Sequence, residues 1–180
     1  MSMNRTKIFF DCEFTWLHQK TTLISIWIIS ECWKEFYAEF TDYDKSQCWE
    51  WIKENVINNL TLKESYPRSN RYKWDSAFIK EKLIEWLWQF PWVEVWSDCL
   101  SYDWVLWNTL LSDYSNGYPE LPSWMYYIPF DICTLFKIKW IDPDISREEF
   151  VREEIGNKKI KKHNALFDAK VIKMCYDKLI

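Results

Sequence analysis

Glycine is nearly absent from this chain: Gly117 and Gly156 are the two that occur among 180 residues. Its turns must therefore be made mostly by Asn, Asp and Pro, which bend the backbone through side-chain hydrogen bonds or a fixed φ. Bulky residues are correspondingly frequent, with 14 Trp and 11 Phe. We expect most of these aromatic side chains to fill a hydrophobic core.

The chain also lacks a long hydrophobic run and a disulfide pattern. A membrane span needs roughly 20 consecutive apolar residues, and Asp11 and Glu13 interrupt the apolar stretch near the N-terminus. The six cysteines show neither the paired spacing of a zinc site nor the density of a small secreted scaffold. We therefore expect reduced thiols and a cytoplasmic protein that does not associate with membranes.

No excess of positive charge marks the sequence. The 23 Lys and Arg residues face 27 Asp and Glu residues, which gives a formal net charge of -4. A polyanion such as a nucleic acid would therefore have to be bound through local basic groups. The length suits one domain, 1–180, and we find no repeat, low-complexity tract or domain boundary.

Strand and helix patterns follow one another in a simple order. Three runs rich in β-branched and aromatic residues open the chain, and their short connections predict an antiparallel meander. Helical and strand patterns then alternate. This order predicts an α/β fold in which helices pack on both faces of a mixed sheet. The expected strands are 7–12, 22–30, 34–40, 92–96 and a short one before a helix capped by Asp131; the other expected helices are 46–57, 75–90, 102–111, 146–155 and 165–178.

Two carboxylates stand one residue apart in "KIFFDCEFTW", near the end of the first expected strand. Side chains alternate along a strand, so Asp11 and Glu13 lie on one face, with Phe9 behind them and Cys12 on the other face. Carboxylates this close repel each other unless water, a proton or a cation neutralises them, and a divalent cation does so most strongly. By itself, the pattern also suits a strand that runs out into a solvated turn.

A third carboxylate follows the strand 92–96, in "VEVWSDCLSYDWVLW". Asp103 falls in the first turn of the next helix, at the carboxyl end of that strand, where open α/β sheets bind ligands. Asp98 competes for this role, although turn or cap formation is its simpler interpretation. The helix dipole alone also favours an aspartate at the position of Asp103.

The last helical pattern begins in "KKHNALFDAK". Asn164 is suited to cap this helix, which places His163 just before it and Asp168 about one turn inside. With an ordinary pKa of about 6.5, His163 suits the removal of a proton from water near neutral pH. A solvated loop histidine, preceded by a solvated run of lysines, is the alternative interpretation. These lysines are Lys158, Lys159, Lys161 and Lys162.

Together, these motifs resemble those of the DEDDh branch of the ribonuclease-H-like 3′-5′ exonucleases. The resemblance spans nearly the whole chain, and the five-residue step from the histidine to the last aspartate favours the histidine branch over the tyrosine branch. It implies a ribonuclease-H-like fold, four metal-binding carboxylates and a histidine general base. At the matching positions these are Asp11, Glu13, Asp103 and Asp168, with His163 as the base.

A narrower likeness concerns the small exoribonucleases that trim single-stranded, adenylate-containing RNA 3′ ends. The segments "DCEFT", "SYDWV" and "HNALFDA" are similar to theirs. The chain departs from that pattern in its many tryptophans and in having "SDCL" where many exonucleases place Asn or His four residues before the helix aspartate. This likeness implies an RNA substrate and a homodimer.

The chemistry of phosphodiester hydrolysis independently suits these residues. Two divalent ions about 4 Å apart activate a water molecule and stabilise the charge that develops on the phosphoryl oxygens and the leaving group. Carboxylates favour Mg²⁺ or Mn²⁺ as these ions. We expect Asp11 to bridge both ions, Glu13 and Asp168 to complete the first site, and Asp103 to help position the second ion.

Aromatic and basic residues near the carboxylates are candidates for substrate binding. Aromatic rings stack on unpaired bases, and Phe14, directly after Glu13, is the first choice, with Tyr102 the second. Lys162 and the lysines before it are candidates for contacts with phosphates. Three further cationic candidates are Arg68, Arg71 and Lys73.

The sequence therefore predicts a metal-dependent 3′-5′ exoribonuclease that acts on single-stranded RNA. Two alternatives stay open. One is an enzyme of the same fold that acts on DNA 3′ ends, since no residue can be named that would read a 2′-hydroxyl. The other is a nucleic-acid-binding module that no longer cleaves, although all five catalytic positions hold the required residue types.

Overall fold

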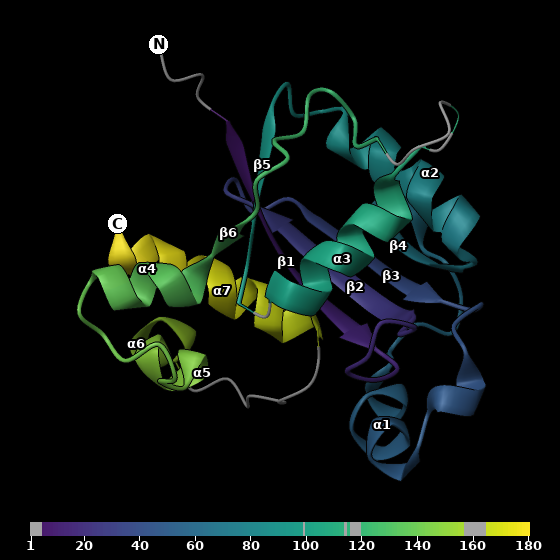
Figure 1. Ribbon diagram of the computed structural model, residues 1–180, viewed down its shortest axis with the longest axis horizontal. Coiled ribbons are helices and arrows are strands. Elements are labelled where there is room, and N and C mark those ends of the chain that lie inside the picture. The colour runs from purple at the N-terminus through teal and green to yellow at the C-terminus, as the bar shows by residue number, and fades with distance from the viewer. Residues whose placement is uncertain (1–4, 99, 114, 116–119, 157–164) are drawn as a thin grey trace.

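The computed structural model describes residues 5–98, 100–113, 115, 120–156 and 165–180 (Figure 1). Within these residues, six strands form one sheet in the order β4-β3-β2-β1-β5-β6. β1, β2 and β3 pair antiparallel, whereas β4 joins β3, β5 joins β1 and β6 joins β5 in parallel. The predicted meander and mixed sheet are confirmed. The strands are β1 (Thr6–Phe14), β2 (Leu23–Ser30), β3 (Glu35–Phe40), β4 (Arg71–Trp74), β5 (Val93–Ser97) and β6 (Phe130–Asp131).

Helices pack on both faces of the sheet, as predicted (Figure 1). One core lies beneath α2 and α3 and takes Phe10 and Cys12 from β1. The other lies beneath α4 and α7 and takes Phe9 from the same strand. β1 is therefore held by apolar packing on both of its faces. The helices are α1 (Glu50–Asn55), α2 (Ser76–Leu87), α3 (Leu100–Leu111), α4 (Ile132–Ile138), α5 (Arg147–Phe150), α6 (Arg152–Ile155) and α7 (Ala165–Leu179), with short 3₁₀ turns at Lys45–Gln47, Ile57–Asn59 and Pro67–Ser69.

Local hydrogen bonds explain where several helices begin. The Asp75 side chain accepts a hydrogen bond of 2.9 Å from the amide of Phe78 at the start of α2, and Asp131 accepts one of 2.8 Å from the amide of Cys133 at the start of α4. Two expected helices are divided instead. The segment 46–57 contains α1 between two 3₁₀ turns, and Val151, whose φ and ψ of -107° and 26° leave the helical region, separates α5 from α6.

The tryptophans correct one expectation. Although Trp27 and Trp107 are fully buried, eight of the 14 are exposed, and Trp140 reaches 96% exposure. The phenylalanines supply more of the core, with six of the 11 buried against three of the 14 tryptophans. Among the helices of the described residues, we find none long and apolar enough to cross a membrane. The cysteines that the structure describes form no disulfide with one another.

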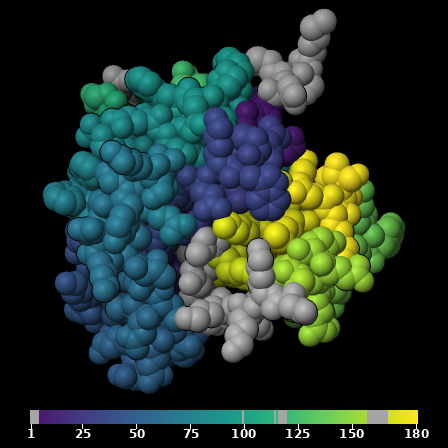
Figure 2. Space-filling model, turned by 180° about the vertical axis from the view of Figure 1, so that it is seen from behind, coloured from purple at the N-terminus to yellow at the C-terminus, as the bar shows by residue number. Residues whose placement is uncertain are grey.

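The C-terminal helix α7 forms one edge of the acidic site described below. α7 contacts β1 and β2 through the second core and packs beside α4 and α5. Seen from behind, α7 in yellow and the short helices α5 and α6 in yellow-green lie next to each other at the surface (Figure 2). The start of α7 is thereby held near the carboxyl end of β1.

Candidate metal centre

The central strand β1 presents the first two carboxylates. In the β1–β2 ladder, Asp11 pairs with Trp27 and Glu13 pairs with Ser25, and the register shifts directly after Glu13. Phe9 and Cys12 enter opposite cores, so Asp11 and Glu13 share the face of Phe9, as the alternation of the strand predicts. The acid pair therefore lies at the carboxyl end of β1, where β2 pairs with the strand.

The third carboxylate comes from α3. β5 pairs in parallel with β1, so the carboxyl ends of the two strands lie at the same edge of the sheet. Asp103 is in the first turn of α3 and is 0% exposed. Its Oδ2 accepts a hydrogen bond of 2.5 Å from the hydroxyl of Ser97, while its Oδ1 is buried without a hydrogen-bond partner. A buried carboxylate oxygen in this state is rare, and it is able to accept a hydrogen bond or bind a cation.

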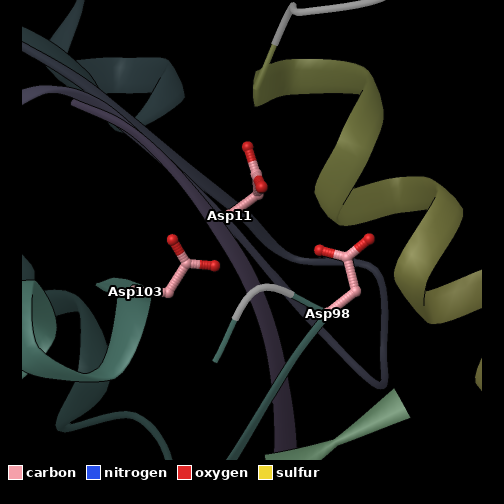
Figure 3. A group of neighbouring side chains, drawn as sticks. All are labelled: Asp11, Asp98 and Asp103. Atoms are coloured by element: carbon pink, nitrogen blue, oxygen red, sulfur yellow. The ribbon is translucent and has the colours of Figure 1, made fainter. Parts of the chain in front are cut away.

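The carboxylates form two groups that share Asp11. In one group, Asp11, Glu13 and Asp168 each offer an oxygen within 4.8 Å of the others. In the second, Asp11, Asp98 and Asp103 do the same. Figure 3 shows the second group, in which side chains from β1, the end of β5 and the first turn of α3 surround a common space. The structure thus brings together all four predicted carboxylates.

Burial and mutual repulsion make this cluster hard to ionise. Burial raises the pKa of Asp11 well above its ordinary value, and the charges of Asp103 and Asp168 raise it further. Burial also raises the pKa of Glu13 to about 7. The pKa of Asp103 is raised by burial as well, against the opposing effect of the hydrogen bond from Ser97. Without a cation, the cluster therefore retains protons at pH values where carboxyl groups are usually ionised.

The donor set is suited to a hard divalent cation. Both groups consist of carboxylate oxygens, which Mg²⁺ and Mn²⁺ prefer, whereas zinc sites are usually built from thiolates and imidazoles. The unpartnered Oδ1 of Asp103 gives such an ion a ready ligand. The residues present therefore fit the metal that the sequence predicts, in two groups of carboxylates that share Asp11.

Asp98 is the member of the site that sequence reasoning assigned to a turn. It directly follows β5, and its Oδ2 lies 3.6 Å from the Nε of Arg147. Burial raises the pKa of Asp98, and the charge of Arg147 opposes that rise. Its place at the carboxyl end of a parallel strand was the available signal, but the same position also suits an ordinary turn former.

Several predicted residues lie outside the described part of the chain. These are His163, the proposed base, together with Lys162, the lysines before it and Asn164. Asp168, in the first turn of α7, is described. The role of His163 therefore stays a prediction from the sequence.

An aromatic pocket adjoins the acidic cluster. The rings of Phe14 and Tyr102 stack with a centroid separation of 5.4 Å and an interplanar angle of 20°. Beside them, a pocket of about 430 Å³ is lined by Glu13, Phe14 and several large apolar side chains. Its tryptophans, Trp16, Trp49 and Trp51, are between 39% and 52% exposed.

Two basic residues that were candidates for phosphate contacts have other partners. Arg71 lies 3.8 Å from Glu35, and its guanidinium stacks over the ring of Trp27. Lys73 lies 3.2 Å from the buried Glu39 and donates a hydrogen bond of 2.7 Å to the carbonyl of Leu62. Both belong to the edge strand β4, and their contact with phosphates stays a prediction from the sequence.

Arg68, the third of these candidates, is exposed.

Comparison with known proteins supports the fold. No family model matches the chain, and no curated protein matches its sequence. A solved structure described as "3'-end specific recognition of histone mRNA stem-loop by 3'-exonuclease" does match, with a TM-score of 0.63 and 9% identity. The match covers 99% of this chain and 83% of that one. At this identity the likeness concerns the fold, and the chain therefore has a ribonuclease-H-like α/β fold, similar to that of a 3′-exonuclease.

Proposed function

We propose that this protein is a metal-dependent 3′-5′ exonuclease that removes nucleotides from the 3′ end of single-stranded RNA. The observation that supports this most directly is that two clusters of three carboxylate residues share Asp11 at the carboxyl ends of β1 and β5. Two-metal phosphodiester hydrolysis uses such a shared ligand between neighbouring ions. The fold of a 3′-exonuclease agrees with this proposal.

In this proposal, the carboxylates hold two ions and the remaining groups position water and substrate. Mg²⁺ or Mn²⁺ would supply an activated water and neutralise the charge that develops on the phosphoryl group. Asp11 would contact both ions, while Glu13 and Asp168 complete the first site. Asp103 serves the second, and the hydroxyl of Ser97 fixes its orientation.

His163 is proposed as the general base. It stands five residues before Asp168 in the sequence, which suits a histidine that takes a proton from water bound near the first group of carboxylates. An unperturbed histidine has a pKa of about 6.5, so histidine as a residue type offers a neutral form that accepts a proton at physiological pH. Lys162 is proposed to contact a substrate phosphate.

The aromatic pocket is proposed to hold the base of a nucleotide whose phosphate lies at the carboxylates. It shares Glu13 with the acidic cluster, and its volume of about 430 Å³ is sufficient for a small ligand. Phe14 and Tyr102 offer a further stacking surface beside it. Aromatic faces bind unpaired bases without strict sequence preference, which supports a single-stranded substrate, with adenylate-rich ends as the proposed target.

RNA is preferred to DNA as the substrate because the similar solved structure concerns a 3′-exonuclease that recognises an mRNA stem-loop. DNA 3′ ends remain the second candidate, because we identify no 2′-hydroxyl ligand among the described residues. A homodimer and a cytoplasmic location are further parts of this proposal.

A time course with 5′-labelled oligoadenylate tests the proposal. With Mg²⁺ or Mn²⁺ we expect a ladder that shortens from the 3′ end, and we expect EDTA or Asp11→Asn to abolish it. Asp144→Asn, which removes an exposed carboxylate, is the matched control and should retain activity. An RNA that stays intact while a DNA oligonucleotide is degraded would assign the enzyme to DNA. If neither is cut, the nuclease proposal fails.

A further inference from the structure

The second group of carboxylates contains a residue that the four-carboxylate pattern does not include. Asp98 offers an oxygen within 4.8 Å of ligand oxygens of both Asp11 and Asp103. Its side chain is 26% exposed, and it lies in the short connection between β5 and α3. Asp98, directly after β5, and Asp103, in the first turn of α3, therefore face the same space (Figure 3).

Arg147 offsets part of the charge of Asp98 without donating a hydrogen bond from Nε to its carboxylate oxygens. The separation from Arg147 Nε to Asp98 Oδ2 is 3.6 Å, which is too long for a hydrogen bond, and Nε has no hydrogen-bond partner. The other guanidinium nitrogens donate to the carbonyl of Ile145 at 2.6 Å and to the sulfur of Cys133 at 2.7 Å. The guanidinium is thus fixed by other groups, and it forms no hydrogen bond through Nε with the Asp98 carboxylate.

A second, independent observation comes from Asp103. This residue is 0% exposed, and its Oδ1 is buried without a hydrogen-bond partner, in the group that contains Asp98. An unsatisfied carboxylate oxygen in such a place is costly unless a ligand completes it. Asp103 therefore marks this group as a cation site, and Asp98 is within coordinating reach of the same ion.

We propose that Asp98 is a direct ligand of the second divalent cation, as a fifth carboxylate of the site. Arg147 acts as a positioning residue, because its guanidinium is held by Ile145 and Cys133 and its charge attracts the Asp98 carboxylate at the end of β5. The second ion then has three carboxylates, from Asp11, Asp98 and Asp103. This inference rests on the metal-binding part of the proposed function and adds a ligand to it.

Calorimetric titration of the full chain with Mn²⁺, without nucleic acid, tests the proposal. For the unaltered protein we expect two binding events. Asp98→Asn should leave the first nearly unchanged and weaken the second by about tenfold or more, as the loss of a ligand or its support does at other metal sites. Asp144→Asn, which removes an exposed carboxylate of the same type, should bind as the unaltered protein does.

An Asp98→Asn isotherm that matches that of the unaltered protein would refute the assignment, as would the absence of a second event before any substitution. If Asp98→Asn fails to fold, the double variant Asp98→Asn with Arg147→Met removes both charges together and avoids an unpaired buried cation. It should show the same selective loss.

The titration contains no RNA, so its outcome is separate from that of the nuclease assay. If the protein cuts no nucleic acid but Asp98→Asn still weakens the second Mn²⁺ site, the exonuclease proposal is refuted and the assignment of Asp98 as a metal ligand stands.

Discussion

Substitution of Glu13 by Gln should stabilise the metal-free protein above neutral pH. Burial raises the pKa of Glu13 from 4.5 to about 7. At roughly 1.4 kcal/mol per pH unit, ionisation of Glu13 at high pH costs the folded chain about 3 kcal/mol relative to the unfolded chain. Gln keeps the size of the side chain and cannot ionise, so the variant avoids this cost.

The sign of the pH dependence follows from proton binding. Between pH 4.5 and about 7 the folded chain holds a proton at Glu13 that the unfolded chain has lost. The free energy of unfolding therefore falls as the pH rises through this window. Glu13→Gln and the unaltered protein should be equally stable at pH 4, and the variant should be more stable by about 3 kcal/mol at pH 8.

Thermal unfolding in EDTA at pH 4, 6 and 8 provides the measurement. For a chain of this length, about 3 kcal/mol corresponds to a rise in Tm of roughly 6 to 12 °C at pH 8. Addition of Mn²⁺ should stabilise the unaltered protein more than the variant, because a ligand that binds the folded state stabilises it by an amount that grows with the logarithm of its affinity. Glu64→Gln, at an exposed position, is the control. A variant with no gain at pH 8, or with the same gain at pH 4, would refute this explanation of the acidic site.

Three other substitutions test separate features of the structure. Ser97→Ala removes the hydroxyl that donates to Asp103, and we expect urea denaturation at pH 8 in EDTA to show a loss of about 1 to 3 kcal/mol. Glu39→Gln removes a buried charge that accepts hydrogen bonds of 2.7 and 2.8 Å from two backbone amides. The loss of its ion pair with Lys73 should lower the free energy of unfolding by about 3 kcal/mol. Mn²⁺ binding should stay unchanged. Replacing Trp49 or Trp51 by Ala should raise KM for single-stranded RNA about tenfold with little change in kcat, since each removes a stacking surface; steady-state kinetics that show the reverse split would place these rings outside the substrate path.

The first half of the fold was accessible from the sequence because its signals are local. The strands of the meander are joined by short turns, and the alternation of Phe9, Asp11 and Glu13 against Cys12 follows from the geometry of one strand. The cap residues Asp75 and Asp131 were likewise visible, because capping depends on residues within one helical turn. In these places local and tertiary preferences agree.

What the sequence did not predict depends on contacts between distant segments. β4 pairs in parallel with β3 after a long excursion of the chain, so no hairpin turn announces it. Asp98 differs from an ordinary turn aspartate through the parallel pairing of β5 with β1, which brings it to Asp11. The exposure of Trp49 and Trp51 is also a tertiary property, because it depends on what packs over α1.

The segments that supply the carboxylates are synthesised at different times, and this sets the order in which the acidic site assembles. The carboxylates come from three segments, of which β1 is made early and α7 is the last described element to be made. A nascent chain that has completed the meander holds two carboxylates of the cluster, Asp11 and Glu13. Water then screens the repulsion between them. The full repulsion arises when α7 docks on β1, after the two cores have most of their apolar residues. Metal capture is therefore expected to be one of the final steps of maturation, driven by a fold that is already nearly complete.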